Sequence, residues 1–157
     1  MEESEVQAIA AGAEGQAKHK QKRQRTKVVF VKAKKKTAVA RAKVRKGGGK
    51  ITINGRSIEM IQPKQLLEFV KEPLALAESD GVGLDIDVQV KGSGYMSQAT
   101  AARAAIAKAI VEFSGNEKLK NKMLAYDRML LVDDFRRVEP KKPLGKKARS
   151  RKQKSKR

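Results

Sequence analysis

Few side chains in this chain have the types and spacing that catalysis requires. The sequence has no cysteine, which excludes disulfides and thiolate metal sites. His19 is the only histidine, and it lies among lysines with no neighbour that would orient it as a general base. Asp133 and Asp134 are adjacent, but neighbouring side chains in an extended segment point apart, and the following Arg136 and Arg137 are close enough to neutralise them. We therefore predict a protein that is not an enzyme and that holds neither a metal nor a cofactor.

The turn Gly92-Ser93-Gly94 has the features of an anion site because it precedes a predicted helix. The first N–H groups of a helix have no partner inside it, and the helix dipole favours negative charge there. Ser97 is the expected N-cap, with Thr100 three positions later. Most such turns only connect two elements, so a plain turn and an anion site both stay open. An enzyme acting on a phosphorylated substrate here is disfavoured because no poised base stands beside the turn.

A row of three cations lies in the segment 37–45. Arg41, Lys43 and Arg45 share one face of a predicted strand, opposite a face of small apolar residues. Side chains two apart on a strand repeat at about 6.6 Å, near the spacing of successive nucleic-acid phosphates. The row therefore suits a phosphate backbone, and a solvated strand face is the alternative.

The formal net charge of +20 belongs to the two ends of the chain. Residues 18–50 carry 15 Lys or Arg and no acid, and residues 136–157 carry 12 Lys or Arg and one acid, whereas residues 51–135 are close to neutral. Like charges repel, so these flanks need a polyanion to settle on. A nucleic acid supplies one through counterion release. An anionic membrane is disfavoured because the flanks lack the Trp, Phe and Leu of an interfacial helix.

One strand and one helix, joined by the glycine turn, organise the predicted fold. Apolar and polar residues alternate from Val82 to Lys91, which predicts a half-buried strand. Residues 98–113 are mostly alanine, which predicts a helix whose backbone packs closely on a sheet. Its expected buried stripe is Ala99, Ala102, Ile106, Ala109, Ile110 and Phe113.

Weaker patterns predict the elements on either side of this unit. We expect strands over 28–31, 37–45 and 51–53, a tight turn at Asn54-Gly55, and helices over 63–70, 74–78 and 117–126. Pro73 is expected to open the second of these helices. A last apolar run, residues 130–132, is expected to close the core.

Length and charge together predict one folded domain with two tails. A core of roughly 100 residues buries about 60% of its unfolded surface. We expect residues 1–27 to form an acidic, then basic, extension that is disordered when free, residues 28–135 a single α/β domain, and residues 136–157 an extended basic tail. Neither a membrane span nor a signal peptide is recognisable, so we expect a cytoplasmic protein.

Three segments of the chain form a recognisable set. They are KKKTAVARAKVRKGGGKITING (34–55), GSGYMSQATAARAAIAKAI (92–110), and YDRMLLVDDFRRVEPKKP (126–143) leading to QKSKR. In this order they resemble the universal small-subunit ribosomal protein nine family, over about residues 28–157. The length and the Glu-Pro-Lys-Lys-Pro segment resemble archaeal or eukaryotic-type members.

The resemblance implies a particular fold. It is an α/β two-layer sandwich with helices on one face of a mixed, mainly antiparallel four-stranded sheet, and with long basic extended tails. The family's β–α–β crossover is left-handed, whereas the residue pattern alone predicts the common right-handed form. The strand number and the hand are thus expectations that come from the family.

The resemblance also implies a function. The chain would be a structural constituent of the small ribosomal subunit that binds ribosomal RNA in the subunit head, beside neighbouring ribosomal proteins, with no membrane and no small-molecule substrate. During translation its tail would support peptidyl-site tRNA through Lys156 and Arg157. The residues expected to bind ribosomal RNA are Lys34, Lys35, Lys36, Arg41, Lys43, Arg45, Lys46, Lys50, Ser93, Gly94, Gln98, Arg103, Arg136, Arg137, Lys141, Lys142, Lys146, Lys147, Arg149, Arg151, Lys152 and Lys154.

Two departures from the family limit what carries over. Ser93 stands where many members have glycine, which weakens the expectation of close backbone approach to RNA at this turn. Lys154 and Lys156 stand where Phe or Tyr is common, so a charge contact to transfer RNA carries over and a stacking contact does not.

A free-standing RNA chaperone or architectural nucleic-acid-binding protein is the alternative. The same charges would serve any RNA or DNA, because phosphate contacts carry no base information. Such a protein would wash off small subunits at high salt, whereas a structural constituent would co-sediment with them.

Overall fold

A computed structural model of the protein describes residues 27–150, so the predictions for residues 1–26 and 151–157 lie outside it. A five-stranded sheet and three α-helices make up the described part. The strands are β1 (Val28–Lys35), β2 (Ala38–Lys46), β3 (Ile51–Ile53), β4 (Arg56–Ser57) and β5 (Leu84–Lys91). The α-helices are α2 (Lys64–Ala77), α3 (Tyr95–Ser114) and α4 (Glu117–Tyr126), with short 3₁₀ helices η1 (Ile58–Met60), η2 (Glu78–Gly81) and η3 (Arg128–Leu130).

The sheet is mixed and mainly antiparallel, with strand order β1-β2-β5-β3-β4. It has five strands instead of the expected four, because Arg56–Ser57 pairs back onto β3. The turn between β3 and β4 is the predicted Asn54-Gly55, with φ of 51° and 79°, as a two-residue hairpin requires. β3 and β5 are parallel and are joined through α2, so a β–α–β crossover is present, while its expected left hand stays a prediction.

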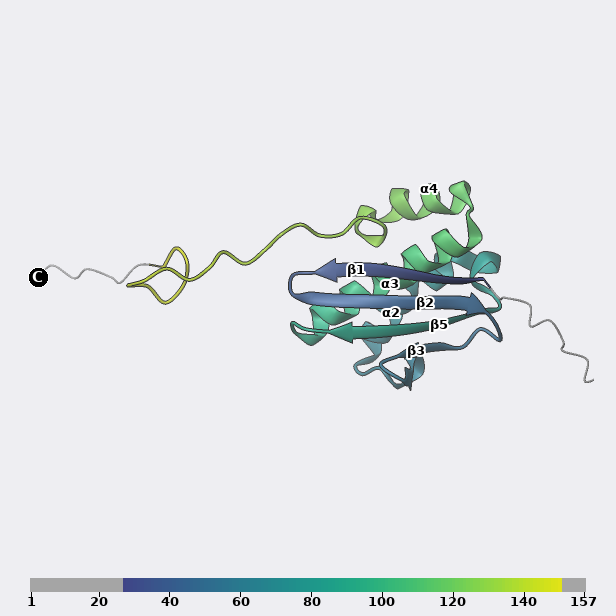
Figure 1. The fold of residues 1–157 in the computed structure, drawn as a ribbon, viewed down its shortest axis with the longest axis horizontal. Coiled ribbons are helices and arrows are strands. Elements are labelled where there is room, and N and C mark those ends of the chain that lie inside the picture. The colour runs from purple at the N-terminus through teal and green to yellow at the C-terminus, as the bar shows by residue number, and fades with distance from the viewer. Residues whose placement is uncertain (1–26, 151–157) are drawn as a thin grey trace, which may run out of the picture.

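The helices cover one face of the sheet and leave the other face open. Figure 1 shows α2 and α3 together on one side of β1, β2 and β5. The strands follow this division residue by residue: in β2, Ala40, Ala42 and Val44 are buried, whereas Arg41 and Lys43 are exposed. Alternation along a strand therefore separates an apolar inner face from a polar open face.

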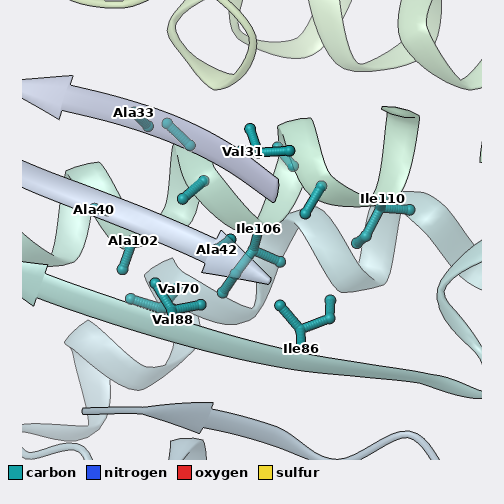
Figure 2. Close-up of a cluster of buried hydrophobic side chains, with 14 of the residues drawn as sticks. Val31, Ala33, Ala40, Ala42, Val70, Ile86, Val88, Ala102, Ile106 and Ile110 are labelled. Atoms are coloured by element: carbon teal, nitrogen blue, oxygen red, sulfur yellow. The ribbon is translucent and has the colours of Figure 1, made fainter. Parts of the chain in front are cut away.

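Small side chains bring α3 close to the sheet. Figure 2 shows Ala102 and Ile106 of α3 facing Ala40 and Ala42 of β2, and all four side chains are buried. The predicted buried stripe was too narrow, because α2, α4 and η3 also pack around this helix. The further buried alanines of α3 are Ala101, Ala104, Ala105 and Ala107.

Two helix boundaries differ from the predicted ones. α3 begins at Tyr95 with Gly94 as its N-cap, three residues before Ser97, because the extended backbone of Gly94 already accepts a hydrogen bond from the Gln98 N–H at 3.0 Å. α2 continues through Pro73 instead of ending before it. A proline removes one helical hydrogen bond, and here its fully buried ring offsets part of that loss by packing in the core.

The last apolar run closes the core through one residue. Leu130 of η3 is fully buried and Leu131 packs against the core, whereas Val132 is exposed. Beyond it the chain leaves the domain, and Figure 1 shows the described part of the tail running away from the sheet. This part is not fully extended, because Glu139 pairs with Lys142 at 3.2 Å and with Arg149 at 2.9 Å and closes a loop.

We predict that Gly92→Ala lowers the free energy of unfolding by about 3 kcal/mol, measured by urea denaturation. Gly92 has a φ of 86°, and an added Cβ would lie 2.5 Å from the carbonyl oxygen of Thr37. The matched control is Gly55→Ala, which has a φ of 79° and open space around the new Cβ, and which should cost only about 1 kcal/mol. Equal costs at the two positions would show that the contact with Thr37 is unimportant.

Candidate nucleic-acid interface

The predicted cation row lies on the open face of the sheet. Arg41, Lys43 and Arg45 of β2 are all exposed, and the buried residues between them hold the strand against α3. Because β2 is paired on both sides, with β1 and with β5, the backbone that carries the row is held along its whole length. The row is therefore presented on a rigid surface.

Strand β1 adds residues to this surface that the sequence-based prediction did not include. Lys32 lies directly opposite Arg41, and Phe30 lies opposite Lys43, whose Nζ is 5.9 Å from the centroid of the phenyl ring. The alternation of Phe30, Lys32 and Lys34 was a usable signal, because antiparallel pairing across the tight turn at Lys36-Thr37 places them on the same face as the row. We call Phe30, Lys32, Arg41 and Lys43 the open-face patch.

The acidic residues of the open face are held by donors of the same chain. Asp85 accepts hydrogen bonds from the N–H groups of Gly48 at 2.9 Å and Lys50 at 3.1 Å, and it lies 3.4 Å from Nε of Arg45. The Lys50 hydrogen bond is the main cause that lowers the pKa of Asp85. Asp87 accepts a hydrogen bond from the Thr52 hydroxyl at 2.9 Å. The free positive charge of this face is therefore concentrated over β1 and β2.

The glycine turn before α3 is exposed and tightly built. Gly92 and Ser93 have φ of 86° and 57°, and both Ser93 and Gly94 are exposed as expected for residues that meet a partner. The Gln98 amide donates a hydrogen bond to the Gly92 carbonyl at 3.2 Å, so this side chain closes the turn. Binding of RNA by Ser93, Gly94 and Gln98 stays a prediction.

Arg103 does not lie on this surface, which corrects one predicted RNA-binding residue. It is 7% exposed and its guanidinium pairs with Glu72 at 2.5 Å and with Asp127 at 2.9 Å. The guanidinium also stacks on the Phe69 ring at 4.4 Å. Arg103 thus joins α2, α3 and the start of η3 inside the domain. A buried cation with two carboxylate partners is a structural element of the core.

The root of the tail is fastened to the domain by Asp134. This carboxylate is buried, and it pairs with Arg136 at 2.7 Å and with Lys35 at the end of β1. Hydrogen bonds from Arg136 and then from Lys35 hold the pKa of Asp134 far below its ordinary value. The neighbouring Asp133 pairs with Lys108 of α3 at 2.5 Å. We call Lys35, Lys108, Asp133, Asp134 and Arg136 the tail clamp.

The tail clamp explains why the carboxylate pair is not a reactive site. Arg136 neutralises Asp134 as predicted. Arg137 was expected to do the same, but it donates a hydrogen bond to the main-chain carbonyl of Lys36 at 2.7 Å. Lys35 is less available to RNA than predicted, because its ammonium is engaged by Asp134. Within residues 27–150, no cluster of His, Cys, Asp and Glu is suited to a metal ion.

The other predicted RNA-binding residues fall into two groups. Exposed positions outside the tail clamp are Lys36, Lys46, Lys50, Arg137, Lys141, Lys142, Lys146, Lys147 and Arg149, and Lys34 is half-buried. Arg151, Lys152, Lys154, Lys156 and Arg157 lie outside the described residues. Among residues 27–150, no helix combines the length and the apolar composition that a membrane span requires.

Comparisons with known proteins agree on one family. The family model described as Ribosomal protein S9/S16 matches residues 33–157. The chain is 47% identical over 119 residues to the small ribosomal subunit protein uS9 of Methanococcus maripaludis, covering 74% of this chain and 89% of that protein. It is 49% identical over 117 residues to the protein of the same name from Thermoplasma volcanium, with the same coverage.

We predict that Asp134→Asn destabilises the protein in a pH-dependent way. The folded pKa of Asp134 is depressed, so its contribution to stability is fully present above the unfolded value of about 3.9 and declines as the pH falls below it. The wild type should therefore exceed D134N in unfolding free energy at pH 7, and the gap should narrow below about pH 4. Denaturant titrations from pH 2 to 7 measure this gap.

Glu59→Gln is the matched control, because it removes one exposed carboxylate from η1, outside the tail clamp. A gap between wild type and D134N that stays constant through the acid range would show that Asp134 is not held as an ionised group.

Proposed function

This chain belongs to the ribosomal protein S9/S16 family, and from this premise we propose that it binds ribosomal RNA in the head of the small subunit and supports peptidyl-site tRNA. It is a ribosomal protein of the small subunit, and it is a structural component and not an enzyme. Its place is accordingly the cytoplasmic ribosome, among ribosomal RNA and other ribosomal proteins. Membership of this family excludes an enzyme that acts on a phosphorylated substrate at the glycine turn.

The observation that carries the RNA proposal is the separation of free cations from paired ones. Within residues 27–150, Arg41, Lys43 and Lys32 of the open face form no ion pair, while Asp85 and Asp87 beside them accept hydrogen bonds from the chain's own donors. A phosphate backbone meets positive charge there without a competing free carboxylate on β1 or β2. The archaeal relatives are named as small ribosomal subunit proteins, which supports ribosomal RNA as the proposed ligand of this surface.

The domain and the tail have different tasks in this proposal. Residues 28–135, with a left-handed β–α–β crossover, supply a rigid shape, and residues 136–157 supply an adaptable cationic arm. The tail clamp supports this division, since ion pairs to Lys35 and Lys108 fix the point at which the arm departs. Residues 1–27 are an N-terminal extension without an assigned role.

The transfer-RNA contact is assigned to the end of the arm. Lys156 and Arg157 are the terminal cations, and they match the family's tail in type of charge. Phosphates of the anticodon stem-loop are the proposed ligand, because only charge recognition carries over.

Deletion of residues 144–157 should reduce the salt dependence of binding to ribosomal RNA. Each lost phosphate contact lowers the slope of log K against log salt by roughly 0.7 to 0.9, so we expect a fall of several units. Filter binding from 50 to 300 mM salt measures the slope. The control is Lys118→Gln with Lys120→Gln, two exposed cations of α4 outside the proposed interface. An unchanged slope after the deletion would remove the arm from the RNA interface.

Replacing Lys156 and Arg157 by alanine should weaken peptidyl-site tRNA binding to small subunits by about two- to fivefold, because a few exposed phosphate contacts are lost. Assembly should be unaffected, since the mutant protein should co-sediment with subunits after a high-salt wash. The matched control is Lys146→Ala with Lys147→Ala, which removes the same charge nearer the domain and should leave tRNA binding unchanged. Release of the wild-type protein by the wash would instead favour a free-standing chaperone.

A further inference from the structure

Phe30 has an aromatic side chain that lies outside the hydrophobic core. It is 73% exposed on the open face, whereas Val29 and Val31 on either side face the core. Among the strand residues described it is the only aromatic one. A single exposed apolar residue is ordinary by itself, so its meaning depends on what surrounds it.

A shallow hollow surrounds the Phe30 ring, and its lining surface is mostly apolar although charged residues border it. It has a volume of about 330 Å³, and three cations, Lys32, Arg41 and Lys43, border it. Gln89 of β5 lines it next to Arg41, which is its partner in the strand register. The hollow therefore combines an exposed ring, three ammonium or guanidinium groups and one amide on a rigid sheet.

These groups match the parts of one nucleotide. A base has a flat π-face that stacks on an exposed aromatic ring, and stacking tolerates every base. Its phosphates need cations, and two cations lie near the ring. Lys43 Nζ is 5.9 Å from the Phe30 centroid, and Arg41 is two residues before Lys43 in β2. The Gln89 amide can both donate to and accept from a base edge.

Charge on the face orients the nucleotide. Asp87 borders the hollow on the β5 side, and its carboxylate would repel a phosphate there. The β1 and β2 side carries Lys32, Arg41 and Lys43 without a carboxylate, so the phosphates belong on that side. A duplex has its bases stacked internally and cannot reach the ring, and an acidic peptide would satisfy the cations while leaving Phe30 unused.

We infer that the open-face patch binds an unpaired ribonucleotide of ribosomal RNA, with its base stacked on Phe30 and its phosphates beside Lys32, Arg41 and Lys43. The inference rests on the proposed function as an RNA-binding protein of the small subunit, and it adds a base-level contact to a surface otherwise read as phosphate-binding. Single-stranded RNA is thus distinguished from duplex RNA by one side chain.

The test measures binding of the full chain to a single-stranded RNA dodecamer and to a duplex of equal length by fluorescence anisotropy. Phe30→Ala should weaken single-strand binding about tenfold, while the salt slope and the duplex affinity stay at wild-type values. Phe30→Tyr keeps the ring and should bind like the wild type. Phe135→Ala is the matched control, because Phe135 is 88% exposed but lies between Asp134 and Arg136 of the tail clamp and is not part of the open-face patch.

A strand containing 2-aminopurine adds a direct measurement, because stacking on Phe30 should quench its fluorescence in the wild type and not in F30A. Equal affinities of wild type and F30A for the single strand would overturn the inference. It would also be overturned if F30A bound RNA normally but was lost from assembled subunits, because a neighbouring protein would then cover the open face. Absence of salt-dependent RNA binding by the wild type itself would instead refute the proposed function.

Discussion

The close contact between α3 and the sheet is the constraint on which the rest of the structure depends. Alanines on both sides, such as Ala40 of β2 and Ala102 of α3, let the two backbones approach and leave no room for water. This contact uses one face of the sheet completely. Most polar residues of β1, β2 and β5 consequently lie on the other face, so the packing of the core also decides where a polyanion can bind. Lys35 is an exception, because it lies on the inner face and pairs with the buried Asp134.

The basic residues also differ in whether a carboxylate of the same chain pairs with them. Arg103, Lys35 and Lys108 look like any other cation in the sequence, yet each is neutralised by a carboxylate of the domain or of the tail root. They contribute to shape, whereas the RNA contacts proposed for the open face use Lys32, Arg41 and Lys43, for which residues 27–150 supply no carboxylate partner. The net charge of +20 already counts the paired carboxylates, and residues 136–157, with 12 Lys or Arg and one acid, carry +11 of it.

The parts of the fold that follow from local pattern could be predicted, and the parts that follow from long-range contact could not. α4 spans the predicted residues 117–126, and β5 covers the predicted alternating segment from Leu84, two residues after its expected start at Val82. Arg103 was assigned to RNA from the family resemblance, and the sequence did not reveal its ion pairs because Glu72 and Asp127 are distant from it and no spacing rule joins them. Pro73 was expected to start a helix because its burial in the core, which compensates a missing hydrogen bond, has no sequence signature.

The order of the strands affects whether the protein aggregates before it is assembled into a ribosomal subunit. β1 and β4 are the two edges of the sheet, and an unpaired edge invites the strand of a second molecule. β4 has only two residues, and β1 carries Lys32 and Lys34, whose repulsion discourages a like-charged copy from adding alongside. The same lysine-rich composition that suits a polyanion thus also keeps a newly made, unassembled molecule from aggregating edge to edge.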